Sequence, residues 1–160
     1  MLPDPMQQCP IISRVRLDVY HEIMRVMGLD VGDKRIGIAV SDSLLMTAQG
    51  RPTLRRTSLD NDVKHLRELA MENEVHQIVV GKPLHMSGDE SRQSQKTASF
   101  AQSLARSLGL PVVLWDERLT TFAAEQHLEE IGIKWRQRRR HVDKIAAMLI
   151  LQSYLDSHRS

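Results

Sequence analysis

Four acidic residues stand where the sequence predicts that a strand ends or a helix begins, and such residues could hold a cation or carry a proton. Asp30 follows the apolar run RVMGL, and Asp116 and Glu117 follow the run PVVLW. Asp143 lies near the start of a helix expected over residues 141–157. In open α/β sheets, binding and catalytic residues lie beyond the carboxyl ends of the strands. We therefore expect these carboxylates at one edge of a sheet.

Asp143 is the most informative of them, because it shares a helix face with core-type side chains. Helical spacing places it in line with Ala146, Ala147, Ile150, Leu151 and Tyr154. That stripe should face the sheet rather than water. A buried carboxylate without a partner is costly, so we expect Asp143 to meet a metal ion or a basic side chain.

Each carboxylate also has a purely structural interpretation. Asp30 could form a turn. Asp116 or Glu117 could interact with the dipole of a helix that begins at Thr120, and Asp143 could form a salt bridge with Lys or Arg. The sequence leaves these alternatives open.

Acids that meet at one edge would repel one another if all were ionised, and a divalent cation would remove that repulsion. Oxygen ligands suit Mg²⁺ or Mn²⁺, whereas Zn²⁺ prefers His and Cys. The seven His residues include no pair at the HExxH spacing, and the single Cys is Cys9. The acids therefore predict a Mg²⁺ or Mn²⁺ site, which suits phosphoryl chemistry.

Basic residues near these acids favour a substrate that carries phosphate groups. They lie in the turn after Asp30, in the loop over 81–92 that leads into a helix N-terminus, beside Glu117, and in the run KWRQRRR over 134–140. The candidate phosphate-binding residues are Lys34, Arg35, Lys82, Arg92, Arg118, Arg136, Arg138, Arg139 and Arg140. The run over 134–140 precedes the helix with Asp143 and could guide a phosphate backbone to it, although such runs are usually solvated loops.

The composition limits the class of protein. The chain has 160 residues, of which 41% are hydrophobic and 26% charged, and its formal net charge is +2. This length and balance fit one globular domain. No apolar run approaches the ~20 residues of a membrane-spanning helix, and a single Cys excludes an internal disulfide. The small basic excess permits nucleic-acid binding without requiring it.

Hydrophobic periodicity predicts an α/β fold with a mixed five-stranded sheet. Strands are expected over 25–30, 36–42, 46–54, 76–81 and 111–117, and helices over 58–75, 90–109, 120–132 and 141–157. The short link after the first strand makes the first two strands an antiparallel hairpin, and Gly50 and Pro52 favour an edge position for the third. The later alternation of strand and helix predicts that the last two strands are parallel, with helices on both faces.

The first 23 residues differ from the rest. They contain Pro3, Pro5 and Pro10 and show no apolar periodicity. A secretory signal would have a basic start and a continuous apolar centre, and neither is present. We therefore expect a disordered extension or a non-native start over residues 1–23, followed by one domain over residues 24–158.

Four segments together resemble the bacterial YqgF/RuvX proteins across nearly all of residues 24–156. They are GLDVGDKRIGIAVSD (28–42), IVVGKPLHMSGDES (78–91), DERLTT (116–121) and HVDKIAAMLILQSYLD (141–156). The resemblance implies an RNase H-like fold, akin to the RuvC Holliday-junction resolvase. It also implies a cytoplasmic, metal-dependent nuclease in which Asp30, Glu117 and Asp143 are both the catalytic acids and the metal ligands.

One feature departs from the wider RNase H pattern. Those enzymes usually carry an acid at the end of the fourth strand, where this chain reads VVGKPL. The resemblance implies that Glu117, after the fifth strand, takes that place. Whether one or two metal ions bind is left open.

The family resemblance implies processing of the 5′ end of pre-16S rRNA, so the expected partner is a ribosomal precursor RNA. The alternatives are a Holliday junction resolvase acting on branched DNA and a noncatalytic RNA-binding ribosome-assembly factor. An ATPase of the actin and sugar-kinase type would need a second phosphate-binding half, and the sequence has one. We expect no membrane association, and a monomer or a weak homodimer.

Overall fold

The computed structural model describes residues 24–85, 87–88, 90–120, 126, 129–130 and 142–158. The extension expected over 1–23 and the basic run over 134–140 lie outside the described residues, as does most of the helix expected over 120–132. Among the described residues, no helix has the length and apolar character needed to cross a membrane.

Five strands form one mixed sheet, as the sequence predicts. The strands are β1 (Arg25–Val31), β2 (Arg35–Ser41), β3 (Ala48–Arg55), β4 (Val75–Lys82) and β5 (Val112–Asp116). Their order across the sheet is β3-β2-β1-β4-β5. β1 and β2 pair antiparallel, as do β2 and β3, whereas β4 runs parallel to both β1 and β5. The carboxyl ends of β1, β4 and β5 therefore meet at one edge.

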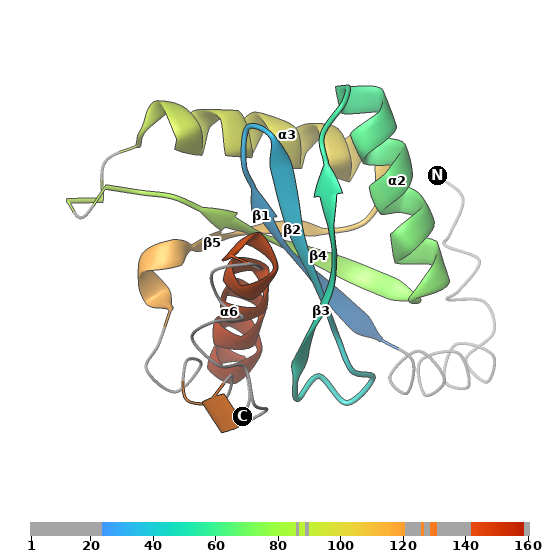
Figure 1. Cartoon of the computed structure of the whole chain (residues 1–160), viewed down its shortest axis with the longest axis vertical. Coiled ribbons are helices and arrows are strands. Elements are labelled where there is room, and N and C mark those ends of the chain that lie inside the picture. Colours follow the sequence, from blue (N-terminus) through green and yellow to red (C-terminus); the bar gives the residue numbers. More distant parts are fainter. Residues whose placement is uncertain are drawn as a thin grey trace, which may run out of the picture.

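Helices cover both faces of the sheet (Figure 1). They are α2 (Leu59–Glu72), α3 (Arg92–Leu108) and α6 (Val142–Ser157), and the short 3-10 helix η2 (Glu117–Leu119) follows β5. Ser58 caps α2 by accepting from the Asn61 amide. Ser91 and Ser94 form a capping box at the start of α3, and Gly109 ends that helix in the left-handed conformation at φ 66°. These local signals fix where the helices begin and end.

The side chains on the two faces of β1 belong to different hydrophobic cores. Leu29 packs with Leu66 and Leu104 in the core beneath α2 and α3, whereas Leu151 of α6 belongs to the core on the other face. Successive side chains in a strand alternate between faces. Asp30 therefore lies on the face that α6 covers, at the carboxyl end of β1.

Two glycines allow α6 to lie directly on the sheet. A Cβ at Gly28 would be 2.6 Å from the Cβ of Leu151, and one at Gly37 would collide with the backbone carbonyl of Asp143. Gly37 is the register partner of Asp30. The close approach at Gly37 thus brings the first turn of α6, with Asp143, beside the end of β1.

Two details differ from the sequence-based expectations. Glu117 is not the last residue of a strand, because the chain leaves the sheet after Asp116 and turns into η2. The buried surface of α6 is also wider than one stripe: Ala146 is only half-buried, whereas the polar residues Gln152 and Ser153 are buried. Gln152 accepts from the amide of Ala48 at 2.9 Å, which ties α6 to the edge strand β3.

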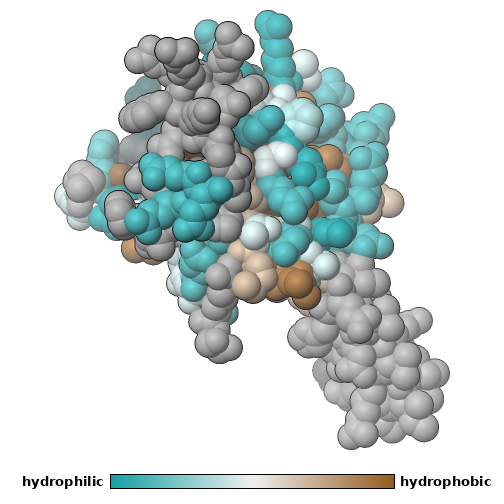
Figure 2. Space-filling model, turned by 60° about the horizontal axis from the view of Figure 1, so that its bottom comes forward, coloured by the Kyte–Doolittle hydropathy of each residue, from teal (hydrophilic) through white to brown (hydrophobic). Residues whose placement is uncertain are grey.

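Among the coloured residues in Figure 2, most of the visible surface is hydrophilic, and the most prominent group of hydrophobic residues lies near the lower centre of the view. Isolated exposed apolar residues are normal on a folded protein surface. Among the described residues, the most exposed large ones are Leu44 and Met71, at 77% and 74%.

Gly37→Ala should destabilise the protein, because the new methyl group meets helix backbone rather than a flexible side chain. We expect the free energy of unfolding to fall by about 1–3 kcal/mol, as for other overpacked sites. Urea unfolding followed by circular dichroism measures the change. Wild-type stability in this variant would contradict the close packing of α6 on β2.

Candidate active site

Asp30 and Glu117 form a hydrogen-bonded acidic pair at the carboxyl edge of the parallel strands. Burial raises the pKa of Asp30 to about 6, with a further increase from the charge of Asp143. Burial, followed by the charge of Asp30, raises the pKa of Glu117 to about 7. The hydrogen bond between them lowers the pKa of Asp30 and raises that of Glu117.

The fold makes room for Glu117 at the end of β4. A Cβ at Gly81 would be 2.9 Å from Oε1 of Glu117 and even closer to Ile150. The carboxyl group of Glu117 thus occupies the space that a side chain at Gly81 would fill. A residue that follows β5 supplies the acid beside the end of β4, where the sequence itself has none.

Asp116 and Glu117 have separate roles, which hydrophobic periodicity alone does not distinguish and for which the family resemblance selects Glu117. Asp116 accepts hydrogen bonds from the amide and the guanidinium of Arg118, and the Arg118 bond holds the pKa of Asp116 below its usual range. Asp116 therefore caps the turn of η2, and Glu117 is the residue whose carboxyl group contacts Asp30.

Asp143 lies close enough to raise the pKa of Asp30, and it forms an ion pair with Arg35. Arg35 Nε is 3.2 Å from Asp143 Oδ2, and the two side chains are 65% and 32% exposed. Of the two partners that the sequence leaves open for Asp143, a metal ion or a basic side chain, the structure shows the basic side chain, and Asp143 is only partly buried rather than enclosed against the sheet as its helix stripe predicts. Because exposed ion pairs contribute only about 0–1 kcal/mol, this contact is easily exchanged for another cation.

The described residues contain no group of three or more His, Cys, Asp or Glu side chains arranged to hold a metal ion. Asp30 and Glu117 form a hydrogen bond with each other, and Asp143 forms an ion pair with Arg35. The chemistry of the donor set nevertheless fits a hard divalent cation, since all three groups are carboxylates and the raised pKa values of Asp30 and Glu117 favour a positive partner, a proton or a cation, between them. Metal binding by Asp30, Glu117 and Asp143 stays a prediction.

Four of the predicted phosphate-binding residues lie near this edge but do not form one cluster. Arg35 contacts Asp143, and Lys34 is exposed in the same β1–β2 turn. Lys82 Nζ is 2.5 Å from Glu90 Oε1, and Arg118 pairs with Asp116.

Arg92, at the start of α3, lines a hollow on the opposite face of the sheet. The four arginines Arg136, Arg138, Arg139 and Arg140 lie outside the described residues. Gly37 and Gly81, which admit Asp143 and Glu117, were not singled out from the sequence. A glycine inside a β-branched run is the signal that could have found them, because it often marks a close approach of another segment.

The raised pKa values make the acidic pair a source of pH-dependent stability. The folded protein binds more protons than the unfolded chain between about pH 4 and pH 7, since the pKa values rise from 3.8 to about 6 for Asp30 and from 4.5 to about 7 for Glu117. The stability that the pair contributes is therefore fully present below about pH 4 and is lost as the pH rises to about 7.

Asp30→Asn should remove part of this loss and raise the free energy of unfolding at pH 8 by about 1–2 kcal/mol. Urea unfolding in chelator-containing buffer over a series of pH values measures it. Asp33→Asn, at an acid that is 68% exposed in the following turn, is the matched control and should change little. Lower stability of Asp30→Asn at pH 8 would show that the pair is not strained by burial.

Comparisons with known proteins agree with this arrangement. Residues 24–157 match the family model RuvX, described as Holliday junction resolvase. A relative from Myxococcus xanthus, named as a candidate pre-16S rRNA nuclease, is 51% identical over 85% of this chain and 90% of its own length. One from Clostridium tetani with the same name is 46% identical over 84% of this chain and 97% of its own.

The fold has a solved counterpart. The Thermus thermophilus RuvC protein, in complex with a Holliday junction substrate, superposes with a TM-score of 0.59 at 17% identity over 86% of this chain and 98% of that one. At this identity the likeness concerns the fold, which is the RNase H-like fold expected from the sequence. The family match and the relatives near 50% identity settle membership: this chain belongs to the RuvX (YqgF) family.

Proposed function

We propose that this protein is a divalent-metal-dependent nuclease that hydrolyses phosphodiester bonds in structured nucleic acid, with the 5′ end of pre-16S rRNA as its substrate. The observation that carries the proposal is the acidic pair, in which strand ends far apart in the sequence bring two carboxyl groups into contact at a sheet edge. The names of relatives near 50% identity support the choice of substrate.

Asp30, Glu117 and Asp143 would hold the Mg²⁺ or Mn²⁺. Such an ion supplies a Lewis acid for the phosphoryl oxygen and lowers the pKa of a bound water. The protein itself influences the charge of the site, because burial raises the pKa values of both Asp30 and Glu117 and so favours a proton on the pair. Loss of that proton leaves Asp30 and Glu117 both ionised, which is the state that attracts a divalent cation.

The basic residues at this edge would bind and orient the substrate backbone. Lys34 and Arg35 are exposed on the turn directly after Asp30. Lys82 and Arg118 stand at the ends of β4 and β5, where Glu90 and Asp116 hold them in place. The arginines over 136–140 remain part of this proposal on their sequence position alone.

We also infer that residues 24–158 form the nuclease domain, as the extent of the family match, residues 24–157, supports. The proposal places the protein in the cytoplasm with precursor rRNA.

Asp30→Asn should abolish cleavage of a labelled pre-16S rRNA 5′ fragment without unfolding the protein. Loss of an interaction worth several kcal/mol in the transition state corresponds to a rate decrease of at least about 100-fold. Wild-type activity should require Mg²⁺ or Mn²⁺ and disappear with chelator. Glu72→Gln is the control, because Glu72 is an exposed acid at the end of α2.

A four-way DNA junction, assayed in parallel, separates the proposed substrate from the resolvase alternative. Cleavage of the junction but not of the RNA would favour the resolvase. Binding of the RNA without cleavage of either substrate would favour a noncatalytic assembly factor. Full activity of Asp30→Asn would refute the catalytic assignment altogether.

A further inference from the structure

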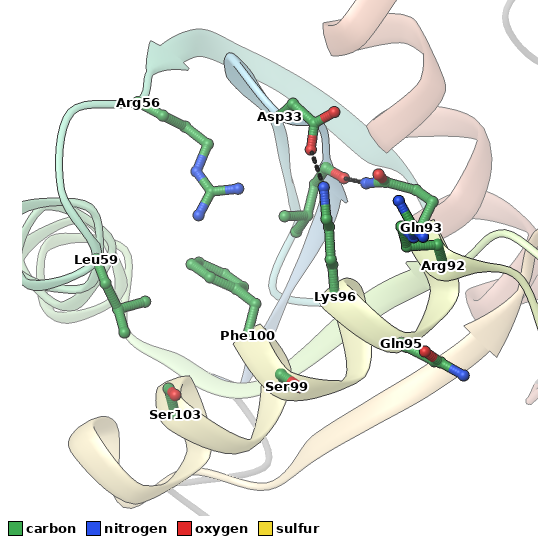
Figure 3. A pocket seen from close by; sticks show the side chains of 11 residues that line it. Asp33, Arg56, Leu59, Arg92, Gln93, Gln95, Lys96, Ser99, Phe100 and Ser103 are labelled. Atoms are coloured by element: carbon green, nitrogen blue, oxygen red, sulfur yellow. Dashed lines mark hydrogen bonds and ion pairs between the residues drawn. The ribbon is translucent and has the colours of Figure 1, made fainter.

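A hollow of about 470 Å³ opens on the face of the sheet opposite the acidic pair. Figure 3 shows the side chains around it, among them Asp33 from the β1–β2 turn, Arg56 from the link between β3 and α2, Leu59 from the start of α2, and Lys96 and Phe100 from α3. Val31, the residue after Asp30, also lines it. The hollow and the acidic pair thus lie on opposite faces of the same edge.

Fixed contacts hold the walls of this hollow in place. Arg56 Nε is 3.0 Å from Oδ2 of Asp62, which is only 2% exposed. The same guanidinium donates to the carbonyl of Gly32 at 2.9 Å and lies 5.1 Å from the ring centroid of Phe100. Gln93 donates to the carbonyl of Val31 at 3.1 Å. The hollow is therefore preformed, as most ligand sites are.

A second hollow, of about 350 Å³, continues the first along α2 and α3. The two share Leu59 and Ser103 as lining residues, and the second adds Lys64 and Arg67 from α2. Together they form one groove, which we call the α2–α3 groove. Arg67 spans its far end and donates to the carbonyl of Ser107 at 3.0 Å.

The groove has the side chains that contact nucleic-acid backbones. Ser99, Ser103 and Ser107 recur every four residues along α3, so they lie along one side of that helix. The basic lining residues are Arg56, Lys64, Arg67, Arg92 and Lys96, and the lining acids are Asp33 and Asp60. Arg56 pairs with the buried Asp62, whereas the pair of Lys96 with Asp33 is exposed and weak enough for a phosphate to replace it. Hydroxyls and basic groups of this kind supply most protein contacts to phosphate and sugar.

The mixed lining of the groove, with charged, hydroxyl and apolar side chains, favours an unpaired strand. The exposed side chain of Leu59, at 46%, offers an apolar surface for a sugar or a base beside the charged groups. An unpaired strand presents both its backbone and its bases to such a groove.

We propose that the α2–α3 groove binds an unpaired nucleic-acid strand that continues from the bond cleaved at the acidic pair. This inference rests on the proposed function. The strand crosses the edge at the β1–β2 turn, where Lys34 and Arg35 are exposed and Asp33 already lines the groove. The groove thereby gives the enzyme a preference for substrates with a single-stranded segment next to the cleaved site.

The test compares binding of two RNA ligands to the full chain in chelator-containing buffer, in which no strand should be cut. One is a duplex with blunt ends, and the other is the same duplex with a single-stranded extension. Lys64→Ala and Lys96→Ala, combined, should raise the Kd for the extended ligand about tenfold and that for the blunt ligand less than about twofold. The log–log salt slope should fall by about one for each lost phosphate contact.

Two further variants make the result specific. Arg106→Ala removes an exposed charge in the last turn of α3 without lining the groove, so it should leave both Kd values unchanged. Ser103→Phe fills the groove where the hollows meet without changing charge, so it should weaken only the extended ligand and leave the salt slope for the blunt one intact. Circular dichroism and thermal unfolding confirm that each variant folds.

Equal losses for both ligands, no loss, or no preference of the wild type for the extension would overturn the groove proposal. The outcome is distinguishable from failure of the proposed function, which would show as full activity of Asp30→Asn. If Asp30→Asn is inactive but the groove variants bind normally, the nuclease stands and the groove does not bind the strand.

Discussion

The hydrogen bond between Asp30 and Glu117 imposes the main physical condition on this structure. Two ionised carboxylates in direct contact repel each other strongly where water is partly excluded. The edge of the sheet can therefore hold them together only if one keeps a proton or a cation joins them. With pKa values of about 6 and 7, the pair changes its proton content close to neutral pH. A weakly held proton in that range is readily replaced by a divalent cation.

Two glycines in the strands allow the acids to come together. Gly37 admits the first turn of α6, and Gly81 admits the carboxyl group of Glu117. Both glycines lie next to strand residues at the edge where β1 and β4 end. Because neither glycine has a side chain, the first turn of α6 and the carboxyl group of Glu117 can lie close to the sheet backbone. The turn after Asp116 directs Glu117 toward β4. Local backbone geometry, more than side-chain packing, decides which acids can share a ligand.

Much of the fold could be predicted from the sequence because its signals are local. The link after β1 is too short for anything but a hairpin, and Ser58, Ser91 and Gly109 mark helix ends by chemistry that acts within one turn. Asp30 and Asp143 could be selected for the same reason, since each ends or begins an apolar pattern. The contacts that complete the site are not local. Nothing in the pattern of residues 111–117 distinguishes Asp116, which caps a turn, from Glu117, which contacts Asp30.

The α2–α3 groove likewise depends on contacts between segments that local sequence signals do not predict. Ser99, Ser103 and Ser107 are visible as a helical repeat, but a polar stripe on a helix is ordinarily solvated surface. Its significance depends on α2 lying opposite, with Lys64 and Arg67 facing the same space. The sheet order and the parallel pairing of β4 determine which helix lies opposite α3. A groove of this kind can therefore be identified only after the topology is known.

The energetics of the acidic pair also favour a functional interpretation over a structural one. A carboxyl pair whose pKa values are raised by burial makes the folded state less stable as the pH approaches neutrality. An amide at position 30 would keep a hydrogen bond to Glu117 and avoid that loss. A protein under selection for stability alone has no reason to keep both acids in contact. Local destabilisation of this kind is characteristic of positions where a protein gives up stability for chemistry, and here it coincides with the edge where three strands end.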